Sequence, residues 1–170
     1  MSSDFKIRVA EPSIEEEDAK AVYNAVKEEC LSGSGPYNKQ FEKNFAEYIG
    51  TKHAIAVNSG TAALHLSLEV LDIRDGDEVI TTPFTFAATS NVIIMQNAKP
   101  VFVDIEPETF NLDPLKIESS ISSKTKAIMP IHYAGQPCEM DAINEIAKKH
   151  NLSVIEDAAP AVGATYKGKK

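Results

Sequence analysis

The feature that most constrains the fold of this chain is an alternation of apolar stretches with amphipathic stretches of helical length. Strands are expected over 53–57, 78–82, 100–105, 127–132 and 152–157, and helices over 61–70, 85–96, 112–121 and 140–150; residues 164–167 are expected to begin another strand. Strands that are apolar throughout are typical of a parallel sheet with helices on both faces. The sequence therefore predicts an α/β fold with a mostly parallel sheet.

Two helices are expected before this alternation. Ser13, with Glu16 three residues later, has the pattern of a capping box and predicts a helix over 13–29. A second helix is expected over 38–49, where the apolar residues form one stripe. Residues 31–36 contain two glycines and a proline and separate the two helices.

Charge and composition exclude several classes of protein. The 170 residues include 17 Lys and Arg against 25 Asp and Glu, a net charge of −8, so we expect no nucleic-acid partner. No apolar run approaches the roughly 18 residues that a membrane span needs, and we expect no membrane association. Two cysteines, Cys30 and Cys138, lie far apart in the sequence and indicate reduced thiols in a cytoplasmic protein.

Several familiar site motifs are missing. The sequence has no P-loop, no G-x-G-x-x-G after a strand and no G-x-S-x-G elbow. The histidines show no ligand spacing, and we expect no metal site; they are His53, His65, His132 and His150.

A turn of small residues, Ser59-Gly60-Thr61-Ala62, follows the first expected strand where a helix begins. The free N–H groups of a helix's first turn, together with the helix dipole, favour an anion. Gly60 permits close approach of the backbone, and Ser59 and Thr61 add hydroxyl groups. A helix cap without a ligand explains this turn equally well at this point.

Two later strands end in residues that suit a flat, cationic ligand. Glu156 and Asp157 end the last clear strand, where alternation points them to opposite sides, so one carboxylate can pair with a ligand nitrogen. The alternative for Asp157 is the N-cap of the next segment. Phe84 and Phe86 follow an earlier strand, where one ring can stack on a ligand or both can belong to the core.

These stretches occur in a fixed order that resembles the DegT/DnrJ/StrS family of sugar aminotransferases, which use pyridoxal 5'-phosphate (PLP). The resemblance covers nearly the whole chain. It is carried by SGPY at 34–37, SGTAAL at 59–64, GDEVI at 76–80, TFAAT at 85–89, PVFVDI at 100–105, PIH at 130–132, GQP at 135–137 and EDAA at 156–159.

The resemblance implies the PLP-dependent transferase fold type I, which is aspartate-aminotransferase-like. It implies an N-terminal helical segment over 1–37 and a partial PLP-binding large domain over 38–170, without the family's C-terminal small domain. It also implies a homodimer for the complete protein.

The resemblance further assigns roles to individual residues. Phe86 would lie against the pyridine ring, and Asp157 would pair with the ring nitrogen and keep it protonated. Pro160 stands where the family often has Gln or His, so no polar side chain is available there. The phosphate would be held by Ser59, Gly60, Thr61 and Ala62.

The activity implied by the resemblance is amino transfer, commonly from glutamate, to a keto group on a nucleotide-linked sugar for amino-sugar and polysaccharide biosynthesis. The family's Schiff-base lysine lies in a later segment. Lys167, Lys169 and Lys170 match the basic run that precedes it, so we expect the chain as given to be inactive alone. Two alternatives stay open: a PLP-dependent sugar dehydratase of the same superfamily, in which a histidine replaces that lysine, and a shortened non-catalytic homologue that binds a phosphate ligand or a partner chain.

Overall fold

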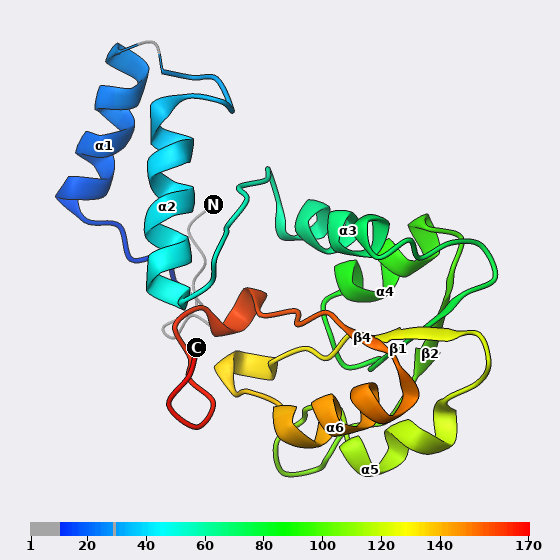
Figure 1. Ribbon diagram of the computed structural model, residues 1–170. Helices are drawn as coiled ribbons and strands as arrows, with labels where there is room; N and C mark the ends of the chain where they lie inside the picture. Colours follow the sequence, from blue (N-terminus) through cyan, green and yellow to red (C-terminus); the bar gives the residue numbers. More distant parts are fainter. Residues whose placement is uncertain (1–10, 29) are drawn as a thin grey trace, which may run out of the picture. The chain divides into compact units, whose positions relative to one another are not determined.

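A computed structural model describes residues 11–28 and 30–170 of the chain (Figure 1). The chain divides into two compact units. The first ends at Ala56 and the second spans Val57–Lys170. The predicted division into 1–37 and 38–170 stays a prediction, and its positions 1–10 and 29 lie outside the described residues. Within the described ranges, no helix is long and apolar enough to cross a membrane.

The first helix, α1, spans Glu16–Lys27. The predicted capping box of Ser13 with Glu16 is wrong, because the N-cap is Glu15, whose backbone N–H donates to Asp18 Oδ2 at 2.9 Å. Three acidic residues fill the first turn, where the positive end of the helix dipole stabilises them. This favourable charge placement explains why the helix begins later than the serine.

The second helix, α2, spans Pro36–Ile49 and begins two residues earlier than predicted. Proline suits the first helical turn because it lacks an N–H that would have no partner there. Gly50 ends the helix in the left-handed conformation, with φ of 82°, and its N–H donates to Ala46 O at 2.9 Å.

The strand expected over 53–57 does not form. The segment has no ladder partner among the described residues, and 79% of Ile55 is exposed. A strand exists only where another strand satisfies its backbone groups, and a local apolar run does not supply that partner. Residues 164–167 likewise form no strand; Tyr166 makes only an isolated antiparallel bridge with Lys169.

The second unit contains a four-stranded parallel sheet, as predicted, in the order β2-β1-β3-β4. The strands are β1 (Glu78–Thr81), β2 (Lys99–Phe102), β3 (Thr125–Ile128) and β4 (Ser153–Val154). The helices are α3 (Gly60–Val70), α4 (Ala87–Met95), α5 (Pro114–Ile117) and α6 (Met140–His150). Short 3₁₀ turns follow α5, β3 and β4 and cover 118–120, 133–135 and 159–161.

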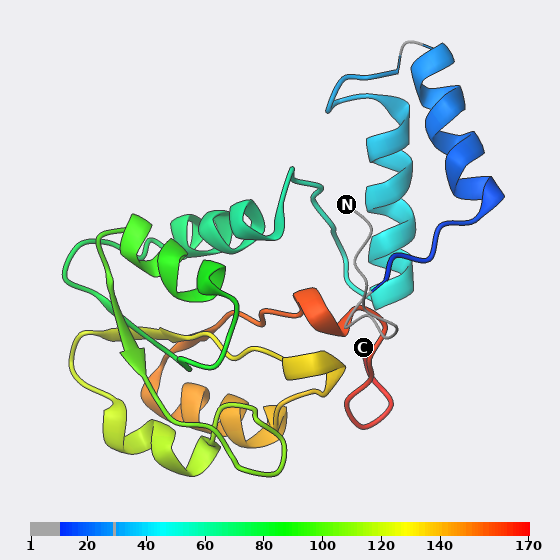
Figure 2. The same ribbon diagram turned by 180° about the vertical axis from the view of Figure 1, so that it is seen from behind.

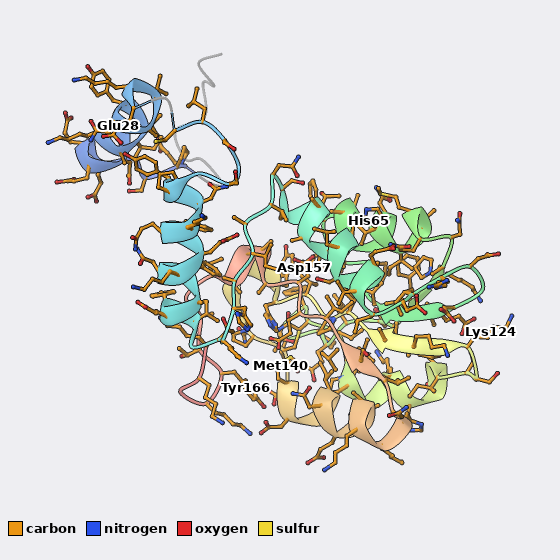
Figure 3. The ribbon with its side chains drawn as sticks, turned by 45° about the horizontal axis from the view of Figure 1, so that its top comes forward. Glu28, His65, Lys124, Met140, Asp157 and Tyr166 are labelled. Carbon is orange, nitrogen blue, oxygen red and sulfur yellow. The ribbon has the colours of Figure 1, made fainter. Side chains whose placement is uncertain are left out.

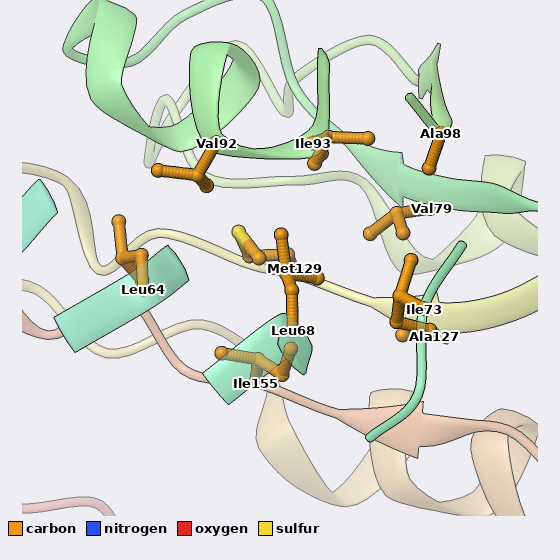
Figure 4. Close-up of a cluster of buried hydrophobic side chains, with 10 residues drawn as sticks. All are labelled: Leu64, Leu68, Ile73, Val79, Val92, Ile93, Ala98, Ala127, Met129 and Ile155. Atoms are coloured by element: carbon orange, nitrogen blue, oxygen red, sulfur yellow. The ribbon is translucent and has the colours of Figure 1, made fainter. Parts of the chain in front are cut away.

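The helices of the second unit cover opposite faces of the sheet. α3 and α4 lie on one face and α5 and α6 on the other, as Figure 1 and Figure 2 show from two sides. Successive residues of β1 point to opposite faces, so Val79 joins the core cluster under α3 and α4, and Ile80 joins the cluster under α5 and α6. Figure 4 shows the first cluster, in which Leu68 of α3 packs near Met129 beyond the end of β3.

The strand order places a topological switch point between β1 and β3. The chain leaves β1 through α4 to reach β2 on one side, then returns past α5 to form β3 on the other side. In open parallel sheets, ligands bind beyond the carboxyl ends of the strands at such a point. The fold therefore directs attention to the segments that follow β1, β3 and β4.

We predict that Leu68→Ala destabilises the whole protein by about 2–5 kcal/mol, because the side chain is fully buried between α3 and the sheet. The matched control is Leu115→Ala in α5, where 90% of the residue is exposed; it should change the free energy of unfolding by less than about 0.5 kcal/mol. Urea unfolding measures both, and equal losses would contradict the core assignment.

Candidate functional site at the carboxyl edge of the sheet

Asp157 lies just beyond β4 and is held by the backbone of the neighbouring segment. Its N–H donates to Pro130 O at 2.9 Å, and its carbonyl accepts from His132 N–H at 3.1 Å. These two bonds form an isolated parallel bridge with Ile131 and extend the pairing of β3 with β4. Asp157, labelled in Figure 3, is therefore fixed at the carboxyl edge of the sheet, with only 5% of its surface exposed.

The buried Asp157 carboxylate accepts two hydrogen bonds. Thr89 Oγ1 donates to Asp157 Oδ2 at 2.7 Å, and the Ala159 N–H donates to Oδ1 at 3.3 Å. Thr89 lies in the first turn of α4, so the first of these bonds joins the helix that follows β1 to the segment that follows β4. The distance between Thr89 Oγ1 and Thr85 Oγ1 is also 2.7 Å.

Thr85 and Thr89 are not among the site residues that the sequence predicts. Their spacing of four positions was the available signal, because residues four apart at a helix start can bring two side chains to the same side. The partner, Asp157, lies 68 positions away from Thr89, and no local pattern identifies that contact.

Glu156 points away from Asp157, as strand alternation predicts. Its Oε2 lies 2.8 Å from His132 Nε2, while His132 Nδ1 accepts from the Cys138 N–H at 3.1 Å. Because Nδ1 is an acceptor, the ring hydrogen belongs on Nε2 and is donated to Glu156. The two adjacent carboxylates thus have different partners, and only Asp157 contacts the helix that follows β1.

The start of α3 keeps free backbone donors. Ser59 is its N-cap, and its hydroxyl accepts from the Ala62 N–H at 3.1 Å. The N–H groups of Gly60 and Thr61 have no partner within the helix, and they donate to nothing else in the described part of the chain. A Cβ added to Gly60 would meet no atom within 4 Å. This first turn has the donors and the open space that an anion needs.

The two aromatic residues after β1 differ in their surroundings. Phe84 packs against Tyr133 and Phe110, with ring centroids 4.7 and 5.6 Å away. Phe86 is the N-cap residue of α4, and 77% of it is exposed. Of the two residues, Phe86 is thus the more exposed, with 77% against 39% for Phe84.

Pro160 lies three residues after Asp157, within the 3₁₀ turn over 159–161. Its ring supplies no donor or acceptor at that position. Among the described residues, no group of three or more His, Cys, Asp or Glu side chains could hold a metal ion. A surface hollow of about 270 Å³ lies elsewhere, between α5 and α6, and contains none of the predicted site residues.

A family model of the DegT/DnrJ/EryC1/StrS aminotransferases matches residues 12–170. The GDP-perosamine synthase of Caulobacter vibrioides is 50% identical over 170 residues, which cover 100% of this chain and 46% of that protein. These matches confirm the family resemblance that the motifs predict.

Solved structures give the same result for the fold. An aminotransferase from Psychrobacter cryohalolentis superposes with a TM-score of 0.90 at 45% identity, covering 94% of this chain and 40% of that one. A putative sugar aminotransferase from Streptococcus pneumoniae, in its PLP form, gives a TM-score of 0.87 at 34% identity, covering 97% and 46%. The predicted fold type I architecture is confirmed, and the chain spans less than half the length of these relatives.

The structure predicts different reactivities for the two cysteines. Burial raises the pKa of the Cys138 thiol to about 12, whereas Cys30 is partly accessible in the first unit. At pH 8 only roughly one Cys138 in ten thousand is a thiolate, the reactive form. Iodoacetamide at pH 8 should therefore modify Cys30 and spare Cys138 in the native protein, as peptide mass analysis can show. Equal rates at the two sites would contradict this prediction; both should react after denaturation.

Proposed function

The chain belongs to the DegT/DnrJ/EryC1/StrS aminotransferase family, and from this we propose that the whole protein transfers an amino group to a keto group on a nucleotide-linked sugar, with PLP as its cofactor. The observation that carries the proposal is the buried Asp157 carboxylate, held at the carboxyl edge of the sheet. The named activity of the relative from Caulobacter, GDP-perosamine synthase, supports a nucleotide-sugar substrate.

The residues at the edge suit the two ends of PLP. The cofactor has a phosphate at one end and a protonated pyridine nitrogen at the other. The free N–H groups of Gly60 and Thr61 at the start of an 11-residue helix suit the phosphate, because they add to the positive end of the helix dipole. The carboxylate of Asp157 suits the ring nitrogen, because opposite charges in a buried site stabilise each other.

PLP supplies an electron-accepting ring that stabilises the carbanion formed when a proton leaves the amino donor. In our proposal, Asp157 holds the proton at the ring nitrogen and so keeps that ring electron-poor. Phe86 would cover one face of the ring with its exposed aromatic surface. Ser59, Gly60, Thr61 and Ala62 would bind the phosphate.

Glutamate is the amino donor in this proposal, and the complete protein acts as a homodimer. The Schiff-base lysine that the resemblance implies lies in a segment of the relatives that this chain does not cover. The proposal therefore concerns the whole protein. Product analysis separates it from the dehydratase alternative: a sugar that loses water without gaining nitrogen would contradict amino transfer.

We predict that Asp157→Asn lowers the rate at which the PLP-loaded protein converts glutamate to 2-oxoglutarate by about 100-fold or more. The neutral amide of this variant carries no charge that could stabilise the proton on the ring nitrogen of PLP. Removing one partner of a buried charge pair changes free energies by enough to give a rate effect of this size. Single-turnover absorbance of the cofactor measures the rate without a sugar substrate.

Asp75→Asn is the matched control, because it makes the same chemical change at an exposed turn far along the chain from Asp157. It should keep the wild-type rate. A normal rate in Asp157→Asn would remove Asp157 from the proposed site, and wild-type protein that leaves glutamate unchanged would contradict the proposed donor.

We also predict that Thr61→Val weakens PLP binding by about 10-fold, because one hydroxyl donor to the charged phosphate is lost while the shape is kept. Binding of pyridoxal, which lacks the phosphate, should not change. Calorimetric titration with both ligands gives the comparison, and an equal loss for the two would contradict a phosphate contact at Thr61.

A further inference from the structure

Thr89 and Asp157 form a buried hydrogen bond between two side chains at the carboxyl edge of the sheet. Thr89 is fully buried, 5% of Asp157 is exposed, and the two oxygen atoms are 2.7 Å apart. A buried hydroxyl destabilises a protein unless it is hydrogen-bonded. The described residues offer the Thr89 hydroxyl two partners, Asp157 Oδ2 and Thr85 Oγ1.

The direction of these hydrogen bonds follows from the chemistry of the groups. An ionised carboxylate has no hydrogen to donate, so the single Thr89 hydroxyl hydrogen must point to Asp157. The Thr89 oxygen is then left as an acceptor, and the Thr85 hydroxyl donates to it. The three side chains form a one-way chain, from Thr85 to Thr89 to the carboxylate, that suits the ionised form of Asp157.

The same bonds fix the orientation of the carboxylate. Thr89 occupies one lone pair on Oδ2, and the Ala159 N–H occupies one on Oδ1. Each carboxylate oxygen has two lone pairs, so both oxygens keep one for a further donor. Rotation of the carboxyl group would break the 2.7 Å hydrogen bond from Thr89, whose position is fixed by α4.

We propose that Thr89 is a positioning residue for the cofactor, and that Thr85 supports it from one hydrogen bond further away. Thr89 holds the Asp157 carboxylate turned so that a free lone pair can meet the ring nitrogen of bound PLP. This inference rests on the proposed function, since it gives Thr89 its effect through the pairing of Asp157 with the cofactor.

The test compares variants of the whole protein that change one hydroxyl at a time. Thr89→Val keeps the side-chain shape and removes the hydroxyl, Thr89→Ser keeps the hydroxyl, and Thr85→Val removes only the outer donor. The readouts are PLP affinity, the pH profile of the bound cofactor's absorbance, and the thermal midpoint without cofactor. The last readout reports stability by itself.

We expect Thr89→Val to weaken PLP affinity about 10-fold or more and to shift the pH profile, because a hydrogen bond to a charged group is lost. Thr89→Ser should stay within about 3-fold of wild type, and Thr85→Val should fall between the two, since it removes only the donor that polarises Thr89. A purely structural threonine would change the thermal midpoint and leave the pH profile in place.

The inference is overturned if Thr89→Val binds PLP with wild-type affinity and pH profile, or if Thr89→Ser is as impaired as Thr89→Val. If Thr89→Val does not fold, the test uses Thr85→Val instead, because Thr85 is only partly buried. An unchanged pH profile in Thr85→Val then overturns the inference. Asp157→Asn distinguishes a failure of the proposed function from a failure of the role given to Thr89. If it weakens PLP binding while the threonine variants do not, the proposed function stands and the role of Thr89 falls; if it also has no effect, the proposed function falls as well.

Discussion

Parallel pairing of four strands is the constraint on which the rest of the second unit depends. All four strands run in one direction, so every segment that leaves a strand does so at the same edge. Helices must then cross back over both faces, and those that follow a strand begin near that edge. This is why Thr89, at the start of α4, can reach Asp157, which follows β4, although the two are 68 positions apart in the chain.

Local patterns predicted the strands of this sheet, most clearly β1, whereas β2 is partly exposed. All of β1 is buried, and its alternate residues Val79 and Ile80 serve two different clusters. The pattern failed at 53–57, where the apolar run is as convincing but no partner strand lies beside it within residues 11–28 and 30–170. A strand also needs a partner strand, which is supplied by residues distant in the sequence. A local apolar pattern does not show whether that partner exists.

The candidate site divides in the same way. Asp157 and the turn from Ser59 to Ala62 could be singled out because a carboxylate or a glycine directly after an apolar run is a local signal. Thr89, which contacts Asp157, and Thr85, which contacts Thr89, carried no such signal, since their role depends on a contact formed only by the sheet. Helix starts were also missed by up to three residues, because Pro36 and the acidic turn of α1 outweigh the caps expected from the sequence.

Three features of the second unit have no explanation among the contacts of the described residues. Gly60 has room for a side chain and no left-handed backbone that would require glycine, yet glycine in a helix is less stable than alanine by up to about 1 kcal/mol. Phe86 exposes 77% of its surface beside a sheet that has apolar clusters on both faces. Asp157 is a buried carboxylate whose described partners are neutral donors, an arrangement that lacks a balancing positive charge. The proposed cofactor, with a phosphate, a flat ring and a protonated nitrogen, would account for all three at once, whereas a purely structural explanation needs a separate reason for each.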